Sequence, residues 1–168
     1  MARRVWALIG SAIFLVVAPG FIAGLAPYWV AHWRMEPPFL GVEALRWLGV
    51  ALIVLGGIGL LECFARFALQ GLGTPAPIAP PQHLVVTGAY RFVRNPMYVA
   101  VTALILGQAL LLGSAALIAY AALIAASFHL FVVFYEEPTL RGSFGAEYQA
   151  FCKAVPRWLP RLTPWRGA

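Results

Sequence analysis

The chain has 168 residues, of which 62% are hydrophobic and 11% are charged, and its formal net charge is +6. Because about a quarter of the residues in soluble domains are charged, this composition excludes a soluble protein and indicates an integral membrane protein. The basic residues are scattered and form no basic helix face, which argues against nucleic acid as a partner.

The first predicted transmembrane helix runs from Val5 to about Val30, behind the basic pair Arg3 and Arg4. At ~1.5 Å per residue, this run is long enough to cross ~30 Å of hydrocarbon. A cleaved signal peptide has the same order of basic and apolar residues, but its apolar core is shorter than this one. The Pro19–Gly20 pair predicts a kink within the helix.

The second predicted helix runs from about Leu40 to Leu61. Gly49, Ile53 and Gly56 share one face of this helix. Small residues let helix backbones approach closely in lipid, so this face is expected to pack against a neighbouring helix.

Two features follow the second helix. Glu62 and Arg66 stand four residues apart and predict an ion pair at the membrane boundary, and whether either residue faces a ligand is open. The segment 71–81 then reads GLGTPAPIAPP, and its prolines exclude a helix and predict a stiff, extended linker.

Residues 84–98 read LVVTGAYRFVRNPMY and place turn residues, arginines and aromatic residues between two apolar regions. Gly88 supplies a turn, and Arg91 and Arg94 put two cations three residues apart. Asn95–Pro96 predicts a helix start, because Asn accepts backbone hydrogen bonds at an N-cap and Pro fits the first helical position. The positive end of the helix dipole adds to the arginines, so we expect this loop to hold an anionic group such as a cofactor carboxylate.

The third and fourth predicted helices form a hairpin. The third runs from Met97 to about Leu112 and spans only ~24 Å at ~1.5 Å per residue, so its start is expected to lie below the interface in a pocket lined by protein. The Gly113–Ser114 turn joins it to the fourth helix, Ala115 to Tyr135, which runs back antiparallel.

The hairpin is expected to return Glu136 and Glu137 to the level of Arg94 and Asn95. Two carboxylates at the C-terminal end of a helix are unfavourable, so the pattern favours contact with a cation or with sugar hydroxyls over a solvated helix end. His129 lies about two turns deeper on the face of Glu136. A histidine at that depth is either a functional residue or a packing residue, and both readings stay open.

The tail, residues 139–168, is polar enough to leave the bilayer. It predicts an amphipathic segment that lies on the membrane and covers the site, because apolar residues recur at helical spacing. These residues are Phe144, Tyr148, Phe151, Val155 and Trp158.

The positions of Arg and Lys predict the topology. With both termini inside, ten of these residues lie on the inner side and only Arg34 and Arg46 lie outside. We therefore expect an all-α, polytopic membrane bundle of about four transmembrane helices, with both termini and the site loop in the cytoplasm, in the inner membrane if the source is bacterial. Cys63 and Cys152 have no metal-binding spacing and lie near the reducing side, so free thiols and no metal site are expected.

Two segments together resemble a known superfamily. GAYRFVRNPMYVA is followed about forty residues later by YEEPTLRGSFGAEYQAFCKAVPRWLP. This order is similar to the isoprenylcysteine carboxyl methyltransferase and phospholipid methyltransferase superfamily, over roughly Thr74 to Pro160. Asn95 stands where many members have His, and Ala100 stands where a Gly is usual. The first departure argues against any mechanism that needs a base at position 95.

The resemblance implies S-adenosylmethionine as the methyl donor and a lipophilic or lipid-linked acceptor that arrives from the bilayer, with O-, N- or S-methylation open. It implies catalytic roles for Arg94, Glu136 and Glu137, in which Arg94 and the helix start hold the donor's carboxylate and the glutamates take its ribose hydroxyls or amino group. Tyr90 and Tyr98 would line the adenine or the sulfonium, which an aromatic face attracts. The implied cofactor residues are His83, Leu84, Val85, Val86, Tyr90, Arg94, Asn95, Pro96, Met97, Tyr98, Glu136 and Glu137.

On this interpretation the chain is one membrane-embedded methyltransferase domain, 1–168. Its parts are two N-terminal helices (1–70), a linker and cofactor loop (71–96), a hairpin (97–135) and a cytoplasmic tail (136–168). One alternative is an NADPH-dependent membrane reductase of the sterol-reductase type, which ends in a similar helical unit. Another is a non-enzymatic membrane subunit. The identity of the acceptor and the oligomeric state stay open.

Overall fold

The computed structural model describes residues 2–66 and 84–166, and these residues contain no strand. The predicted all-α bundle is therefore confirmed. Its elements are α1 (Ala2–Gly20), η1 (Phe21–Leu25), α2 (Ala26–Ala31), η2 (Phe39–Gly41), α3 (Ala44–Arg66), η4 (Gly88–Arg91), α4 (Pro96–Leu112), α5 (Ala115–Phe131), η5 (Val132–Glu136) and α6 (Glu137–Ala154). Three of its helical stretches are long and apolar enough to cross a membrane, namely Ala12–Ala31, Ala44–Arg66 and Ala115–Ala154, and Pro96–Leu112 is a shorter apolar helix.

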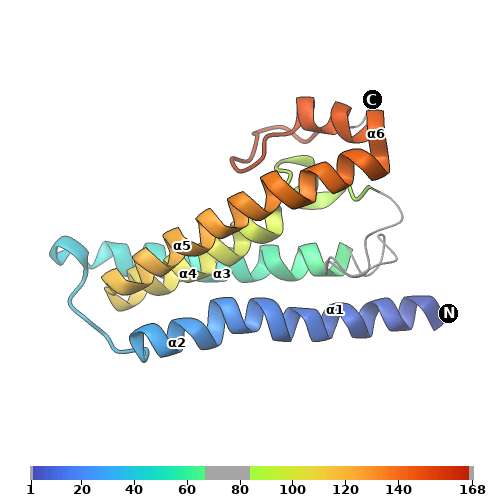
Figure 1. Cartoon of the computed structure of the whole chain (residues 1–168). Helices are drawn as coiled ribbons and strands as arrows, with labels where there is room; N and C mark the ends of the chain where they lie inside the picture. Colours follow the sequence, from blue (N-terminus) through green and yellow to red (C-terminus); the bar gives the residue numbers. More distant parts are fainter. Residues whose placement is uncertain (1, 67–83, 167–168) are drawn as a thin grey trace.

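The long helices run side by side, and the predicted hairpin of α4 and α5 is present (Figure 1). The backbone reverses at Gly113, whose φ of +74° is a left-handed conformation that glycine adopts without steric cost. Both termini lie at the same end of the bundle, and the α4–α5 turn lies at the other end (Figure 1). The loop that begins at Leu84 lies at the same end of the bundle as the termini (Figure 1).

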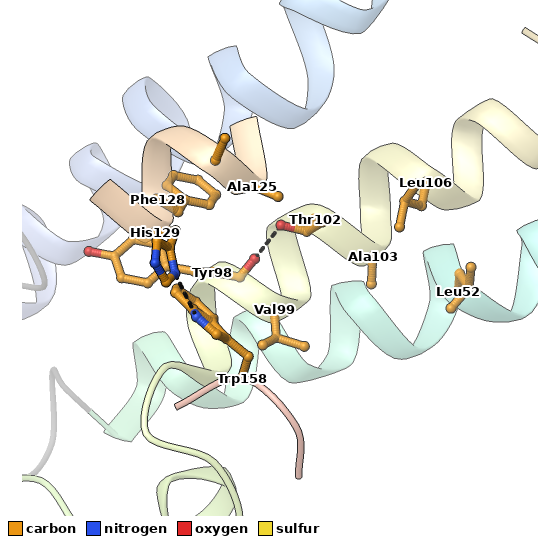
Figure 2. A pocket seen from close by; sticks show the side chains of 11 residues that line it. Leu52, Tyr98, Val99, Thr102, Ala103, Leu106, Ala125, Phe128, His129 and Trp158 are labelled. Atoms are coloured by element: carbon orange, nitrogen blue, oxygen red, sulfur yellow. Dashed lines mark hydrogen bonds between the residues drawn. The ribbon is translucent and has the colours of Figure 1, made fainter. Parts of the chain in front are cut away.

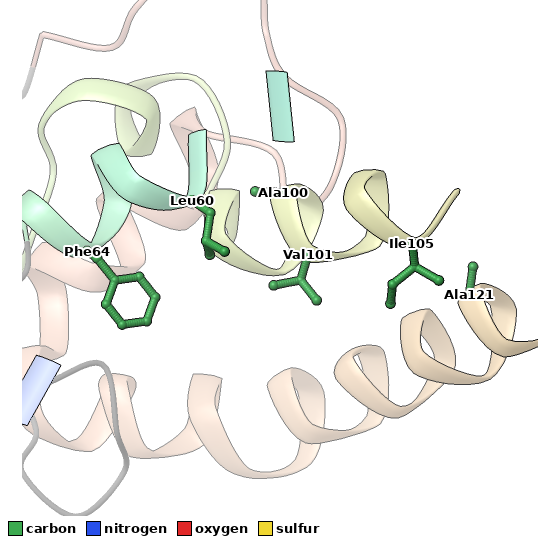
Figure 3. Packing of buried hydrophobic residues seen from close by; sticks show 6 residues of the cluster. All are labelled: Leu60, Phe64, Ala100, Val101, Ile105 and Ala121. Atoms are coloured by element: carbon green, nitrogen blue, oxygen red, sulfur yellow. The ribbon is translucent and has the colours of Figure 1, made fainter. Parts of the chain in front are cut away.

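Helices α3 and α4 pack closely because both carry small residues at their crossing. A Cβ placed on Gly49 would lie 2.7 Å from the carbonyl oxygen of Gly107, and one on Gly56 would lie 2.9 Å from that of Ala100. The predicted packing role of Gly49 and Gly56 is thus confirmed. Beside this crossing a core joins α3, α4 and α5 (Figure 3), and its buried residues are Leu60, Phe64, Ala100, Val101, Ile105 and Ala121.

The first helix is irregular at η1 and not at Pro19–Gly20, where a kink was expected. The cause is Pro27, which has no N–H to donate to the carbonyls four and five residues before it. Those two carbonyls bond across to other helices instead. Gln108 Nε2 donates to the oxygen of Ala23 at 2.7 Å, and Tyr120 Oη donates to that of Ile22 at 2.9 Å. The first helix is thereby tied to α4 and α5.

The fourth helix does not end at Tyr135, which corrects the prediction. It passes through the π-helical turn η5 into α6, and Pro138 lies just after that turn. Proline lacks an N–H and collides with the carbonyl four residues earlier, and a widened turn absorbs both effects without ending the helix. Glu136 and Glu137 therefore do not lie at a helix C-terminus. The chain turns back only at Gly145, whose φ is +50°.

We expect Gly107→Ala to lower the stability of the protein in detergent by about 1–3 kcal/mol, the usual cost of overpacking. The new Cβ would lie 2.7 Å from the Gly49 oxygen and from Ile53 Cγ1, so the helices must separate. Gly57→Ala is the matched control, because nothing lies within 4 Å of its Cβ. Thermal unfolding should show a lower midpoint for the first variant and an unchanged or raised one for the control, and equal midpoints would contradict the packing.

Candidate active site

The loop that precedes α4 is held against the end of α3 at Gly88. Gly88 has a φ of +54°, and a Cβ there would overlap the side chains of Glu62 and Arg66. These two residues form the ion pair that the sequence predicts. Glu62 Oε2 is buried and has no hydrogen-bond partner among the residues that the structure describes. The pair therefore reaches the site loop, with one carboxylate oxygen left to accept a hydrogen bond.

Tyr90 lies in a buried cluster with Val85 and Cys63, against which Met97 also packs. Burial raises the pKa of Tyr90 well above its usual value, and the neighbouring Cys63 and Glu136 raise it further. The Tyr90 phenol is therefore neutral at physiological pH, so it acts as an aromatic surface and a hydrogen-bonding group and not as a base.

Glu136 contacts the first turn of α4. Tyr98 Oη donates a hydrogen bond to Glu136 Oε2 at 2.9 Å, and the Tyr98 ring packs on Phe128 with centroids 4.6 Å apart. This contact brings together the two motif halves, 38 residues apart in the chain. The hairpin was expected to return the acidic pair to the start of the third predicted helix, and this contact confirms that expectation for Glu136.

Glu137 faces different neighbours from Glu136, and only 4% of its surface is exposed. Its carboxylate lies 3.1 Å from Arg94 Nη1, 2.7 Å from Arg157 Nε and 3.5 Å from Arg141 Nη2. Successive residues of a helix point about 100° apart, so adjacent glutamates face different neighbours. A buried carboxylate needs charged partners, and three guanidinium groups around it leave an excess of positive charge beside the start of α4.

Asn95 occupies the predicted N-cap position, and Pro96 is the first residue of α4. The side chain of Asn95 makes no capping hydrogen bond, which corrects the predicted role. Its Nδ2 donates to the carbonyl oxygen of Arg157 at 3.2 Å instead. Asn95 therefore ties the start of α4 to the C-terminal segment, and an amide serves this purpose without any titration.

The C-terminal segment, residues 156–165, is strapped onto the site loop. Three backbone hydrogen bonds of 2.9 Å join them, from Arg94 N to Pro156 O, from Arg161 N to Phe92 O and from Trp165 N to Arg91 O. The tail thus covers the site loop, as the sequence suggested.

The apolar face of α6 does not lie on a membrane surface, which corrects the expectation for the tail. Tyr148, Phe151 and Val155 are buried within the protein, where Leu84 and Val86 pack against them. The alternation of an extended segment places Leu84 and Val86 on this side and Val85 on the side of Tyr90. His83, the remaining predicted cofactor residue, lies outside the described residues.

An apolar cavity of about 520 Å³ begins at Tyr98 and runs along the membrane-spanning part of the bundle (Figure 2). Helices α3, α4 and α5 wall it, and Trp158 of the C-terminal segment closes one end. The ring of Tyr98 thus faces an apolar cavity while its hydroxyl contacts Glu136. The lining residues are Leu52, Tyr98, Val99, Thr102, Ala103, Leu106, Ala125, Ala126, Phe128, His129 and Trp158.

Sequence reasoning gave no site role to Arg157 or Trp158. Both lie in the closing VPRWLP of the chain, where they read as parts of the amphipathic pattern. Arg157 could have been found only by asking which cation pairs with Glu137, because a buried carboxylate requires a charged partner. Trp158 follows it directly, and its place over the cavity depends on the strap, which no local pattern reveals.

A family model described as phospholipid methyltransferase matches residues 44–147, more than half of the chain. The match begins with α3 and includes the site loop, the hairpin and both glutamates. No curated protein and no solved structure matches the chain.

Glu137→Gln should destabilise the protein by about 3–5 kcal/mol, the range for breaking a buried ion pair. The amide keeps the shape of the side chain but leaves Arg94 and Arg157 without a countercharge. Glu43→Gln is the control, because Glu43 is 73% exposed in its pair with Arg46 and such pairs contribute about 0–1 kcal/mol. Both variants are compared by thermal unfolding in detergent, and a Glu137→Gln midpoint as high as that of the control would contradict the network's role.

Proposed function

The chain belongs to the phospholipid methyltransferase family, and from this premise we propose that it transfers a methyl group from S-adenosylmethionine to a lipophilic acceptor that arrives from the bilayer. The family and the apolar helices make it a membrane methyltransferase in general. We propose S-adenosylmethionine as the methyl donor and a lipophilic molecule as the acceptor.

The position of Tyr98 is the observation that carries the proposal. Its hydroxyl bonds to Glu136, and its ring lines an apolar cavity that opens along the bundle. A polar cofactor and a hydrocarbon-bearing acceptor must meet at such a border for a methyl group to pass between them. The family match favours this reaction over the NADPH-dependent reductase alternative.

The residues present fit the groups of S-adenosylmethionine. The arginines around Glu137 and the N-terminus of α4 supply positive potential for its carboxylate. Arg94 already contacts Glu137. We therefore propose that Glu137 holds Arg94 in place, and that Arg94 contributes to the positive potential at the carboxylate of the donor. Glu136 and the buried, unpartnered Glu62 Oε2 suit the donor's amino group or ribose hydroxyls.

S-adenosylmethionine supplies, when bound, an electrophilic methyl group on a sulfonium. The thioether that leaves needs no acid, and charge disperses during the displacement, so the residues mainly position the reactants and exclude water. The faces of Tyr90 and Tyr98 suit a cation such as the sulfonium. Asn95 bonds to the C-terminal segment and cannot serve as a base, in agreement with a reaction that places no base there.

The site is proposed to face the cytoplasm of the cell. Arg46 bonds to the carbonyl oxygen of Leu111 beside the α4–α5 turn, and Arg34 belongs to the loop that bonds to Leu112 there, whereas the other basic residues belong to segments at the terminal end. The positive-inside rule then assigns the terminal end, with the site loop, to the cytoplasm. S-adenosylmethionine, a small soluble cofactor, is available on that side.

We expect the purified protein to bind S-adenosylmethionine in a calorimetric titration, and Glu136→Gln to raise the Kd at least about tenfold. This is the size of losing a hydrogen bond to a charged group, about 1.5–3 kcal/mol. Tyr98→Phe should raise the Kd less, because it removes only the partner of Glu136. Glu43→Gln should bind as the wild type does, because Glu43 pairs with Arg46 beside the α4–α5 turn, at the opposite end of the bundle.

A titration with NADPH in place of S-adenosylmethionine separates the reductase alternative. Binding of NADPH alone, or an unchanged Kd for S-adenosylmethionine in Glu136→Gln, would overturn the proposed site. Labelled S-adenosylmethionine incubated with membranes, followed by mass spectrometry of the lipid-soluble fraction, should then identify the methylated product.

A further inference from the structure

Four polar side chains line the apolar cavity, and three of them have hydrogen bonds that use their polar atoms (Figure 2). Tyr98 Oη donates to Glu136, and Thr102 Oγ1 donates to the carbonyl oxygen of Tyr98 at 2.8 Å. Trp158 Nε1 donates to Nδ1 of His129 at 3.1 Å. The fourth, His129, has no hydrogen bond at Nε2 with any residue that the structure describes.

The bond from Trp158 fixes what His129 offers to a ligand. An indole N–H is a donor only, so Nδ1 of His129 must be unprotonated to accept it. A neutral imidazole then carries its proton on Nε2. His129 is therefore presented as a hydrogen-bond donor at the cavity, and its basic nitrogen is occupied.

The cavity has a polar end and an apolar end. His129, Tyr98 and Trp158 gather at one end, and Leu52 and Leu106 line the other (Figure 2). From residue 98 to residue 106, α4 rises about 12 Å at ~1.5 Å per residue. The cavity thus has room along one helix groove for a hydrocarbon chain, with a single donor beside its polar end.

We propose that this cavity binds the methyl acceptor as an amphiphile with one hydrocarbon chain, and that His129 Nε2–H donates a hydrogen bond to an oxygen of its head group. That the occupant is the acceptor rests on the proposed function. The binding of a chain with an oxygen-bearing head rests on the cavity alone.

Trp158 acts through His129 as a positioning residue. It keeps the proton on Nε2, and the Arg157–Glu137 ion pair and the backbone strap hold it over the cavity. The walls of the cavity are apolar helices, two of them long enough to cross a membrane, so we expect the occupant to enter from the bilayer. An ionisable side chain at this depth is costly without such a use.

The test uses the full chain in detergent micelles without any methyl donor. The probes are palmitate and hexadecylammonium, each with a diazirine in its chain, and mass spectrometry locates the photolabelled residues. Palmitate should label the stretches 99–106 and 125–129. His129→Phe should reduce this labelling about tenfold, as for the loss of one hydrogen bond to a charged group. Labelling by hexadecylammonium, whose head only donates, should not fall.

Three further variants keep the test decisive. Ala125→Phe fills the cavity and should reduce labelling by both probes, whereas Leu123→Phe, at a 63% exposed position outside the lining, should reduce neither. Trp158→Phe frees the His129 tautomer and should reduce palmitate labelling by a smaller factor than His129→Phe. Palmitate labelling that lies elsewhere, or that is unchanged in His129→Phe, would overturn the inference.

The two proposals fail separately. If S-adenosylmethionine binds as expected while palmitate labelling ignores His129, the head-group contact is wrong and the methyltransferase site stands. If labelling depends on His129 and no S-adenosylmethionine binds, the amphiphile site stands and the proposed reaction is wrong.

Discussion

The site depends on one buried carboxylate and its cations. Glu137 belongs to α6, Arg94 precedes α4, and Arg157 belongs to the C-terminal segment, so a single charge network joins three parts of the chain. The buried Glu137 and the mostly buried Arg94 need charged partners, so their ion pairs favour one arrangement of these three parts. This fixes the start of α4, where Asn95 bonds to the carbonyl of Arg157. It also holds Trp158 against His129 at the polar end of the cavity.

Proline shapes two of the membrane helices in the same way and with different results. Pro27 and Pro138 each follow a widened turn, η1 and η5, and neither ends its helix. In the first helix, the carbonyls that Pro27 leaves without a donor accept bonds from α4 and α5 and hold the bundle together. Between α5 and α6, the widened turn η5 lets the helix continue, so that Glu136 contacts Tyr98 and Glu137 contacts the arginines. Both widened turns are thus joined to segments that are distant in the sequence.

The sequence was sufficient wherever one segment decides the outcome. Composition and apolar runs predicted the helices, the spacing of Gly49 and Gly56 predicted a close crossing, and the ion pair of Glu62 and Arg66 followed from their separation. It failed where a distant segment decides. The Asn95 side chain does not cap α4 but donates to the carbonyl oxygen of Arg157, 62 residues away in the chain. The apolar face of α6 packs on the site loop and not on lipid. The fourth helix was expected to end at Tyr135, because no local pattern shows the π-helical turn that carries it past Pro138.

Solubility explains why the proposed methyl transfer would take place at Tyr98. A charged cofactor cannot enter the hydrocarbon region without a large desolvation cost, and a hydrocarbon chain loses the free energy of its burial when it leaves. The reacting atoms of the two can therefore meet only at the border, within reach of groups of both kinds. Tyr98 lies in the first turn of α4, with its hydroxyl at a carboxylate and its ring on the cavity wall. In the proposed reaction the leaving thioether needs no acid, so the main task of the protein is to hold this border in place, and the charge network and the strap join the segments that form it.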